Sequence, residues 1–219
     1  MPDIKKISIL GSTGSIGRQA LDIVAASSGS LQILGLAAGR NIDILCRQIE
    51  QFKPKIVSVQ TKTDADKIKN RFPDIDVFFG KEGLTKVAVF DDVDMVLVAV
   101  VGVAALEPTI EAIKLKKDIA LASKEVLVAA GSVIMPLVKE YGVKMLPVDS
   151  EHSAIMQSFN PKLSSGGFLE YPAKNVAKII LTASGGAFRG LKKDELQNKV
   201  LADALNHPNW DMGQKITID

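Results

Sequence analysis

The sequence predicts an α/β protein built on a Rossmann-like, doubly wound and mostly parallel β-sheet. Short runs rich in Ile, Val and Leu alternate with longer amphipathic segments through the first 150 residues, and this βαβαβ rhythm is typical of a parallel sheet. A glycine-rich turn follows the first apolar run. The chain has 219 residues, of which 47% are hydrophobic, so it is long enough to bury a sizeable core without disulfides.

The predicted strands are apolar throughout rather than alternating, as expected for strands that helices cover on both faces. They are Lys6–Leu10, Leu31–Ala37, Lys55–Val59, Asp76–Phe79, Met95–Val100, Ile119–Ala122 and Val143–Pro147. The predicted helices between them are Ser15–Ala26, Ile42–Gln51, Asp64–Arg71, Val103–Lys114 and Glu125–Glu140. Cys46 lies on the apolar face of the second helix, which favours a buried core thiol over a reactive one.

The pattern changes after about residue 150. A helix is expected at Glu151–Phe159 and a strand at Val176–Leu181. The segment from Ala183 to Gly213 has little regular patterning. Long segments of this kind are usually functional lids or disordered.

The composition argues against several classes of protein. With 27 basic and 25 acidic side chains, the net charge of +2 lacks the basic excess of a dedicated nucleic-acid binder. One Cys and two His exclude a disulfide scaffold and argue against a zinc site. No stretch reaches the roughly 18–20 apolar residues of a membrane span, and no signal-peptide pattern is present. We therefore expect a soluble protein of a reducing compartment, with no nucleic-acid or membrane partner.

A glycine-rich turn, Gly11-Ser12-Thr13-Gly14-Ser15-Ile16-Gly17, connects the first strand to the first helix. Glycines at this place permit a tight turn and the close approach of a pyrophosphate. The N-terminus of the helix attracts the same anion. The pattern therefore predicts a dinucleotide site, in which Gly17 serves helix–strand packing. A plain tight turn is the alternative.

The end of the second strand indicates which dinucleotide binds. NAD sites usually carry an acidic residue there, which binds the ribose 2′-hydroxyl. This strand runs instead into Gly39, Arg40 and Asn41, and Arg40 can pair with a 2′-phosphate. The sequence thus favours NADP(H), with an exposed loop arginine as the alternative. Asn41 can also serve as an N-cap for the next helix.

Polar side chains follow three further predicted strands, where ligands of open α/β sheets bind. Asp149 and Glu151 predict either part of a Mg²⁺ or Mn²⁺ site or a helix N-terminus with Glu in its first turn. Spacing alone favours neither. Lys124 can hold an anionic or carbonyl oxygen, and Ser184 with its following glycines can cradle a phosphate. His152 can serve as a base or a ligand, but we interpret it as a helix-face residue.

The tryptophan near the end of the chain lies in a polar segment, His207-Pro208-Asn209-Trp210. A large apolar ring in such a loop indicates a lid that closes over a bound ring. A tryptophan tucked into a local core is the alternative.

Six motifs, in this order and spacing, resemble those of the 1-deoxy-D-xylulose 5-phosphate reductoisomerases, which are NADPH- and divalent-metal-dependent enzymes of the non-mevalonate isoprenoid pathway. The resemblance runs from Ile7 to Asp219. The motifs are GSTGSIG, AAGRN, ASKE, PVDSEHSA, ASGGAFR and HPNWDMGQKI. PVDSEHSA and HPNW are the most specific of them.

The resemblance implies a role for each matching residue. The implied cofactor-binding residues are Thr13, Gly14, Ser15, Ile16, Gly39, Arg40, Asn41, Ser123, Glu125 and Gly213. The implied substrate-binding residues are Lys124, Ser150, Glu151, Ser184, His207 and Trp210. The implied metal ligands are Asp149 and Glu151. The implied catalytic residues are Lys124, Asp149, Glu151 and His207.

The implied reaction is the isomerisation and reduction of 1-deoxy-D-xylulose 5-phosphate to 2-C-methyl-D-erythritol 4-phosphate. A divalent cation would stabilise the oxyanion charge that develops, and a closing lid would exclude water. The implied organisation is an NADPH-binding domain over residues 1–149 and part of an α+β catalytic domain over 150–219, with a lid at about 184–213. A homodimer of the full-length form is implied, in the cytoplasm, or in the plastid stroma if a transit peptide was removed.

The chain also departs from the family pattern. Ser123 stands where Asn is frequent, Asp211 where Ser is common, and Gln214 where a basic residue is usual. The pattern continues beyond Asp219 to a Glu that is the third metal ligand, so we expect this chain alone to bind NADPH with little or no turnover. The alternatives are another NADP-dependent reductase without a rearrangement, or a nucleotide-binding module that is not an enzyme.

Overall fold

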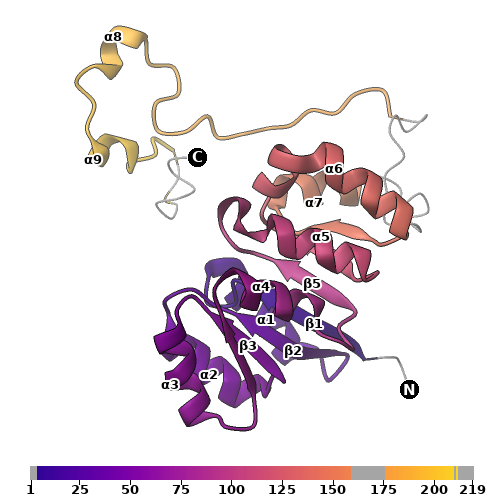
Figure 1. Ribbon diagram of the computed structural model, residues 1–219. Helices are drawn as coiled ribbons and strands as arrows, with labels where there is room; N and C mark the ends of the chain where they lie inside the picture. The colour runs from indigo at the N-terminus through magenta and orange to yellow at the C-terminus, as the bar shows by residue number, and fades with distance from the viewer. Residues whose placement is uncertain (1–3, 159–175, 210, 212–219) are drawn as a thin grey trace. The chain divides into compact units, whose positions relative to one another are not determined.

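Seven parallel strands form one sheet, in the order β4-β3-β2-β1-β5-β6-β7 (Figure 1). The computed structural model describes residues 4–158, 176–209 and 211. The strands are β1 (Lys5–Leu10), β2 (Leu31–Ala37), β3 (Ile56–Val59), β4 (Asp76–Phe79), β5 (Met95–Val98), β6 (Asp118–Leu121) and β7 (Met145–Pro147). The chain winds outward from β1 to β4 and then returns to the other side of β1, so the strand order reverses between β1 and β5. In doubly wound sheets this reversal is where ligands bind.

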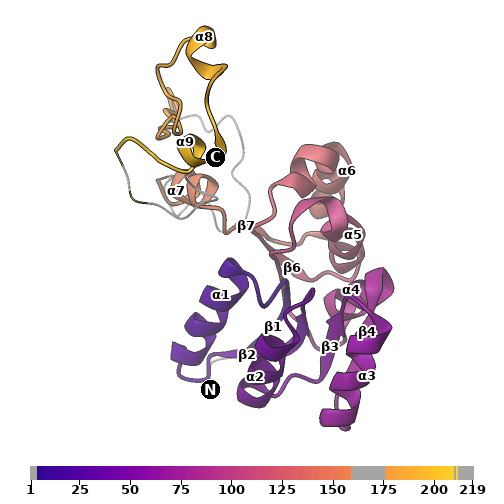
Figure 2. The ribbon, with the colours of Figure 1, turned by 90° about the vertical axis from the view of Figure 1, so that its left-hand side faces the viewer.

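Helices cover both faces of the sheet. They are α1 (Ser15–Ala26), α2 (Ile42–Phe52), α3 (Lys62–Arg71), α4 (Gly80–Val89), α5 (Leu106–Lys114), α6 (Glu125–Tyr141) and α7 (Ser150–Ser158), with a 3₁₀ turn η1 (Gly102–Ala105). One core contains Leu21 of α1 and Leu45 of α2, and the other contains Val87, Ile113 and Ile134 of α4, α5 and α6. Figure 2 shows α1 and α2 on one side of the strands and α4, α5 and α6 on the other.

Burial on both faces explains why the strands do not alternate. All four residues of β3 are buried, as are the last four of β1. The predicted Rossmann-like fold is confirmed, since every neighbouring pair of strands is parallel. Cys46 is 5% exposed, as the helical spacing predicted.

One helix, α4, was missed by the sequence pattern. Its two glycines lower helix propensity by about 1 kcal/mol each relative to alanine, which masks the helical signal. The packing explains one of them. A Cβ on Gly83 would lie 2.4 Å from Ser58 Oγ of β3, so glycine lets α4 pack closely against the sheet. The buried face of the helix includes Val87 and Ala88.

The predicted strand at Val176–Leu181 is wrong. These described residues form no strand, and Ile180 is 74% exposed. An apolar run becomes a strand only when a neighbouring strand completes its hydrogen-bond ladder, and no such partner is present among residues 176–209. The apolar pattern alone could not show this.

The chain divides into two compact units, one ending at residue 175 and the other beginning at 176. In the second unit, the segment predicted to lack regular structure contains two single-turn helices, α8 (Lys193–Leu196) and α9 (Leu201–Ala204). Each is held locally: Lys192 N–H donates to Glu195 at 2.7 Å and Val200 N–H to Asp203 at 2.9 Å. The described part of this unit therefore shows helices but no strand of the expected α+β domain. Helix α7 lies in the first unit; the functional boundary at 149/150 stays a prediction.

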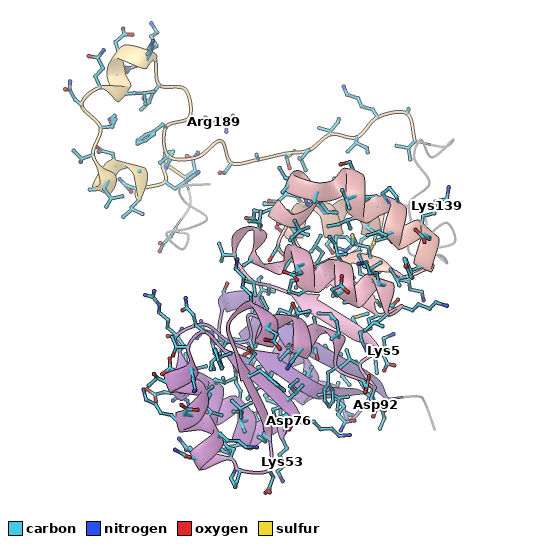
Figure 3. The ribbon with its side chains drawn as sticks, viewed as in Figure 1. Lys5, Lys53, Asp76, Asp92, Lys139 and Arg189 are labelled. Atoms are coloured by element: carbon cyan, nitrogen blue, oxygen red, sulfur yellow. The ribbon has the colours of Figure 1, made fainter. Side chains whose placement is uncertain are left out.

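Ion pairs gather at the amino ends of the strands. Lys5 Nζ lies 3.0 Å from Asp118 Oδ2, and Asp92 lies within 4.0 Å of both Lys6 and Lys55. Lys5 and Asp92 lie at the edge of the sheet near the N-terminus (Figure 3). The two pairs of Asp92 are exposed, and exposed pairs contribute little stability individually. At this edge the charges pair with one another across neighbouring elements. Among the described residues, no helix is long and apolar enough to span a membrane.

Candidate functional site

The glycine-rich turn lies where the strand order reverses. The amides of Gly11 and Ser12 both donate to the carbonyl of Ala37, at the end of β2, at 2.9 Å. On the other side, Ala99 N–H donates to the carbonyl of Leu10 at 2.8 Å. The turn is therefore anchored to the carboxyl ends of β2 and β5 at once. This is the crevice in which open α/β sheets bind nucleotides.

Two of its glycines are required by the close approach of backbone atoms. Gly11 has a φ of +91°, and a Cβ there would lie 2.4 Å from the carbonyl oxygen of Ala99. A Cβ on Gly17 would lie 2.3 Å from the carbonyl oxygen of Gly11 and 2.6 Å from Ser12 Cα. Gly17 thus lets the first turn of α1 pack onto the preceding glycine-rich turn. The sequence predicted a packing role for Gly17 between helix and strand, and the close approach is to the turn that connects them.

The N-terminus of α1 is open to a ligand. Its N-cap residue is Gly14, which has no side chain to accept from the free amides of the first turn. Gly14 and Ser15 are exposed, Ile16 is half-buried and Thr13 is buried. Amides at a helix N-terminus bind anions. The geometry thus fits the predicted phosphate contacts of Gly14, Ser15 and Ile16, and Thr13 would contribute from a more enclosed position.

The segment after β2 places a cation at the same edge of the sheet. Gly39, Arg40 and Asn41 are exposed. Arg40 Nε donates to Oε1 of Gln60, which follows β3, at 3.3 Å, so the outer guanidinium nitrogens are not used by that bond. Asn41 occupies the N-cap position of α2, but its side chain makes no capping hydrogen bond. Of its two predicted roles, the capping contact is absent and the ligand contact stays a prediction.

The residues after β6 connect that strand to β5. Ser123 is buried, and its hydroxyl donates to the carbonyl of Val100 at 2.5 Å. Ser123 therefore holds together the two loops that follow β5 and β6. Glu125 begins α6 and is exposed. Both residues lie at the carboxyl edge of the sheet, as the predicted cofactor contact requires.

Asp149 is at the centre of a charged cluster that joins the ends of β6 and β7. Its Oδ1 lies 3.3 Å from Lys124 Nζ and its Oδ2 lies 2.5 Å from His152 Nδ1. Partial burial raises the pKa of the Asp149 carboxyl, but the hydrogen bonds from His152 and Lys124 outweigh it, so the pKa lies below its usual value. Asp149 is therefore a carboxylate at neutral pH, the form that a metal ion requires.

The segment after Asp149 is helical. Helix α7 begins at Ser150, and Ser153 N–H donates to the Asp149 carbonyl at 2.9 Å. Glu151 is exposed in the first turn and accepts from the Ser150 hydroxyl at 2.9 Å. The alternative of a helix N-terminus therefore describes the backbone correctly, because α7 begins here with Glu151 in its first turn. The Asp149 side chain, however, contacts Lys124 and His152. Within the described ranges, no three His, Cys, Asp or Glu side chains are grouped to hold a metal. The two carboxylates have the oxygen chemistry that Mg²⁺ prefers but form only part of a ligand set.

A cavity of about 520 Å³ opens beside this cluster. Its walls are mostly apolar, and Lys124, Asp149 and His152 form its polar part. The remaining lining residues are Leu121, Leu127, Val128, Met135, Met145, Pro147, Ile155 and Met156. A volume of this size is within the range of small-molecule sites.

Ser184 and His207 belong to the second unit. The Ser184 hydroxyl accepts from Gly186 N–H at 3.2 Å, and both Gly185 and Gly186 have positive φ. Arg189, labelled in Figure 3, donates to the Ser184 carbonyl at 3.5 Å. The turn therefore combines a hydroxyl, two glycines with positive φ and a nearby cation, which fits the predicted phosphate role.

His207 is buried, and its Nδ1 accepts from Asn209 N–H at 3.2 Å. When the ring is neutral, its proton must therefore sit on Nε2. Trp210 and Gly213, predicted as lid and cofactor residues, lie outside the described residues.

Sequence patterns missed two contacts at this edge. His152 lies exposed on α7, as its interpretation as a helix-face residue predicted, and it also contacts Asp149, which the sequence did not indicate. Gln48 of α2 donates to the carbonyl of Ser12 in the glycine-rich turn. The available signal was a glutamine on the apolar face of a helix, between Cys46 and Ile49.

A parallel doubly wound sheet with an open glycine-rich turn at its strand-order reversal defines a dinucleotide-binding protein of the Rossmann type. Two family models specify it further. That of 1-deoxy-D-xylulose 5-phosphate reductoisomerase matches residues 7–131, and that of the C-terminal domain of the same enzyme matches residues 145–219. The chain belongs to the 1-deoxy-D-xylulose 5-phosphate reductoisomerase family.

Individual relatives agree with the family models. The reductoisomerase of Agathobacter rectalis is 52% identical over 218 residues, which cover 99% of this chain and 55% of the relative. A crystal structure of DOX-P reductoisomerase in complex with NADPH, fosmidomycin and magnesium matches 98% of this chain and 54% of its own, with a TM-score of 0.82 and 34% identity. The enzyme from Zymomonas mobilis in complex with NADPH matches 93% and 52%, with a TM-score of 0.82 and 32% identity. The chain thus spans about half the length of the relatives it matches.

Proposed function

We propose that this chain supplies the NADPH site and part of the metal and substrate site of a reductoisomerase that converts 1-deoxy-D-xylulose 5-phosphate to 2-C-methyl-D-erythritol 4-phosphate. The observation that carries the proposal is the placement of an open dinucleotide turn and the Lys124–Asp149 cluster at one edge of a single sheet. The family match and the relatives' complexes with NADPH, fosmidomycin and magnesium support it.

The cofactor would lie across the carboxyl ends of β1, β2 and β6. Its pyrophosphate would lie against the turn from Thr13 to Ile16 and meet the amides of Thr13, Ser15 and Ile16, where the helix dipole of α1 adds attraction. The 2′-phosphate would meet Arg40, flanked by Gly39 and Asn41. Ser123 and Glu125 would border the cofactor further along the edge, with Gly213 as a further contact.

The metal and substrate would lie beside the ends of β6 and β7. Asp149 and Glu151 would hold a Mg²⁺ or Mn²⁺ ion, which when bound stabilises oxyanion charge on the hydroxy-ketone. Lys124 would neutralise a substrate oxygen, and Ser150 would orient the substrate through its hydroxyl. Ser184 and His207 would hold the phosphate of the substrate, with Trp210 as the lid.

The proposal includes the expected organisation: an NADPH-binding domain over residues 1–149, part of a catalytic domain over 150–219 and a homodimer of the full-length form. The relatives named above are from bacteria, which supports the cytoplasm over a plastid.

Replacing Asp149 by asparagine tests the metal role. The substitution keeps the size of the side chain and removes its charge. We therefore expect the dissociation constant for Mn²⁺ to rise about 10-fold or more. Even residues that only orient a metal ligand change metal affinity by about 10- to 100-fold when they are replaced. The signal of free Mn²⁺ in electron paramagnetic resonance measures it. Asp74→Asn is the matched control, because Asp74 is exposed and lies before β4, at the amino ends of the strands.

Equal Mn²⁺ binding by wild type and Asp149→Asn would contradict the metal role. The ion pairs of Asp149 with Lys124 and His152 would then be structural, and a reductase that needs no metal would be the better description. The same measurement thus separates the two candidate functions.

A further inference from the structure

Gln48 is a polar side chain in an apolar environment. It lies on the buried face of α2 with Leu45, Cys46 and Ile49, and is 7% exposed. Its Nε2 donates to the carbonyl of Ser12 at 2.9 Å, across 36 positions of sequence. Burying an amide costs free energy unless hydrogen bonds compensate it, so this contact is the evident reason for a glutamine here.

Only one of the two polar atoms of the Gln48 amide is hydrogen-bonded. The Ser12 carbonyl can only accept, which requires the Gln48 amide to present Nε2 rather than Oε1. Oε1 then makes no hydrogen bond to any described residue. A side chain selected for stability alone would not leave a buried acceptor unpaired, because that costs about 1–3 kcal/mol. The contact with Ser12 therefore indicates a purpose other than packing.

Gln48 completes the anchoring of Ser12, whose two backbone polar groups belong to successive peptides of the glycine-rich turn. The Ser12 amide donates to Ala37 at the end of β2, and its carbonyl accepts from α2. In a planar trans peptide, the carbonyl and the following N–H point in opposite directions. By holding the Ser12 carbonyl toward α2, Gln48 turns the Thr13 N–H away from α2. That amide begins the run of backbone that leads to the open N-terminus of α1.

We propose that Gln48 is a positioning residue of the dinucleotide site, which acts through the Ser12 carbonyl and keeps the amides of Thr13, Ser15 and Ile16 in the orientation that binds a pyrophosphate. Gln48 itself touches no ligand. The inference rests on the proposed NADPH role of this turn. It separates the pyrophosphate part of the site, which depends on Gln48, from the 2′-phosphate part at Arg40, which does not.

The test is Gln48→Met in this chain, which keeps the length of the side chain and removes both polar atoms. We expect the dissociation constant for NADPH, measured by its fluorescence, to rise about 3- to 10-fold, the effect of one hydrogen bond. Binding of 2′-AMP, measured by calorimetry, is expected to stay unchanged, since this fragment carries the 2′-phosphate but no pyrophosphate. Gln51→Met is the control, because Gln51 lies on the same helix and is exposed.

A second variant, Gln48→Asn, retains an amide that is one methylene too short to reach Ser12, and the same pattern is expected from it. Circular dichroism establishes that each variant is folded at the temperature of the titration. A wild-type chain that binds no NADPH overturns the proposed cofactor role itself. A wild-type chain that binds, with folded variants that bind NADPH equally well or lose NADPH and 2′-AMP to the same extent, overturns the positioning role of Gln48 alone.

Discussion

Replacing Gly17 by alanine is expected to lower the free energy of unfolding by about 3 kcal/mol, at the upper end of overpacking effects. The added Cβ would lie 2.3 Å from the Gly11 carbonyl oxygen and 2.6 Å from Ser12 Cα. Both are backbone atoms that cannot rotate aside. The first turn of α1 must therefore move away from the glycine-rich turn, and NADPH binding should weaken with it. Urea denaturation followed by circular dichroism measures the loss.

Gly131→Ala provides the matched control. Gly131 lies in α6, directly after the kink at Ala130, and a Cβ there would meet no atom within 4 Å. Alanine is favoured over glycine in a helix by up to about 1 kcal/mol, so this variant should be as stable as the wild type or more so. If Gly17→Ala and Gly131→Ala unfold at the same urea midpoint, the glycine-rich turn tolerates a side chain at position 17. That result would contradict the expected clash with the Gly11 carbonyl oxygen.

Arg40→Ala is expected to weaken NADPH binding by about 10- to 100-fold, because hydrogen bonds to charged groups contribute about 1.5–3 kcal/mol. The affinity for NADH, which lacks the 2′-phosphate, should not change. Fluorescence titration with the two cofactors measures both constants. Arg47→Ala is the control, since Arg47 is an exposed arginine on α2. An equal loss for NADPH and NADH would mean that Arg40 supports the loop rather than the phosphate.

The sheet could be predicted because its signals are local. The last five residues of β2, Ile33–Ala37, are all buried, so both faces of this part of the strand are covered, and its apolar sequence shows it directly. Helix α4 could not be predicted, since Gly83 is there for a contact with Ser58 of β3 that no local pattern contains. The Val176–Leu181 run has the composition of a strand, but a strand also needs a partner.

The site was predictable where backbone conformation demands a residue type. Gly11 and Gly17 indicate the turn in the sequence, because a side chain at either position would clash with nearby backbone atoms. Contacts between distant segments were not predictable: Lys124 meets Asp149 only because β6 and β7 pair in parallel and end together. Gln48 was missed for the same reason, since its partner Ser12 lies on another element.

Strand β7 has a further consequence for how the molecule behaves at high concentration. It is an outer strand of the described sheet, with only three residues, and its last residue is Pro147. Outer strands expose unpaired backbone groups that can recruit strands of other molecules, and short length and proline both reduce that tendency. The strand that leads into Asp149 is thus poorly suited to intermolecular pairing. Its length and its proline therefore limit how far a strand of another molecule could extend the described sheet on this side.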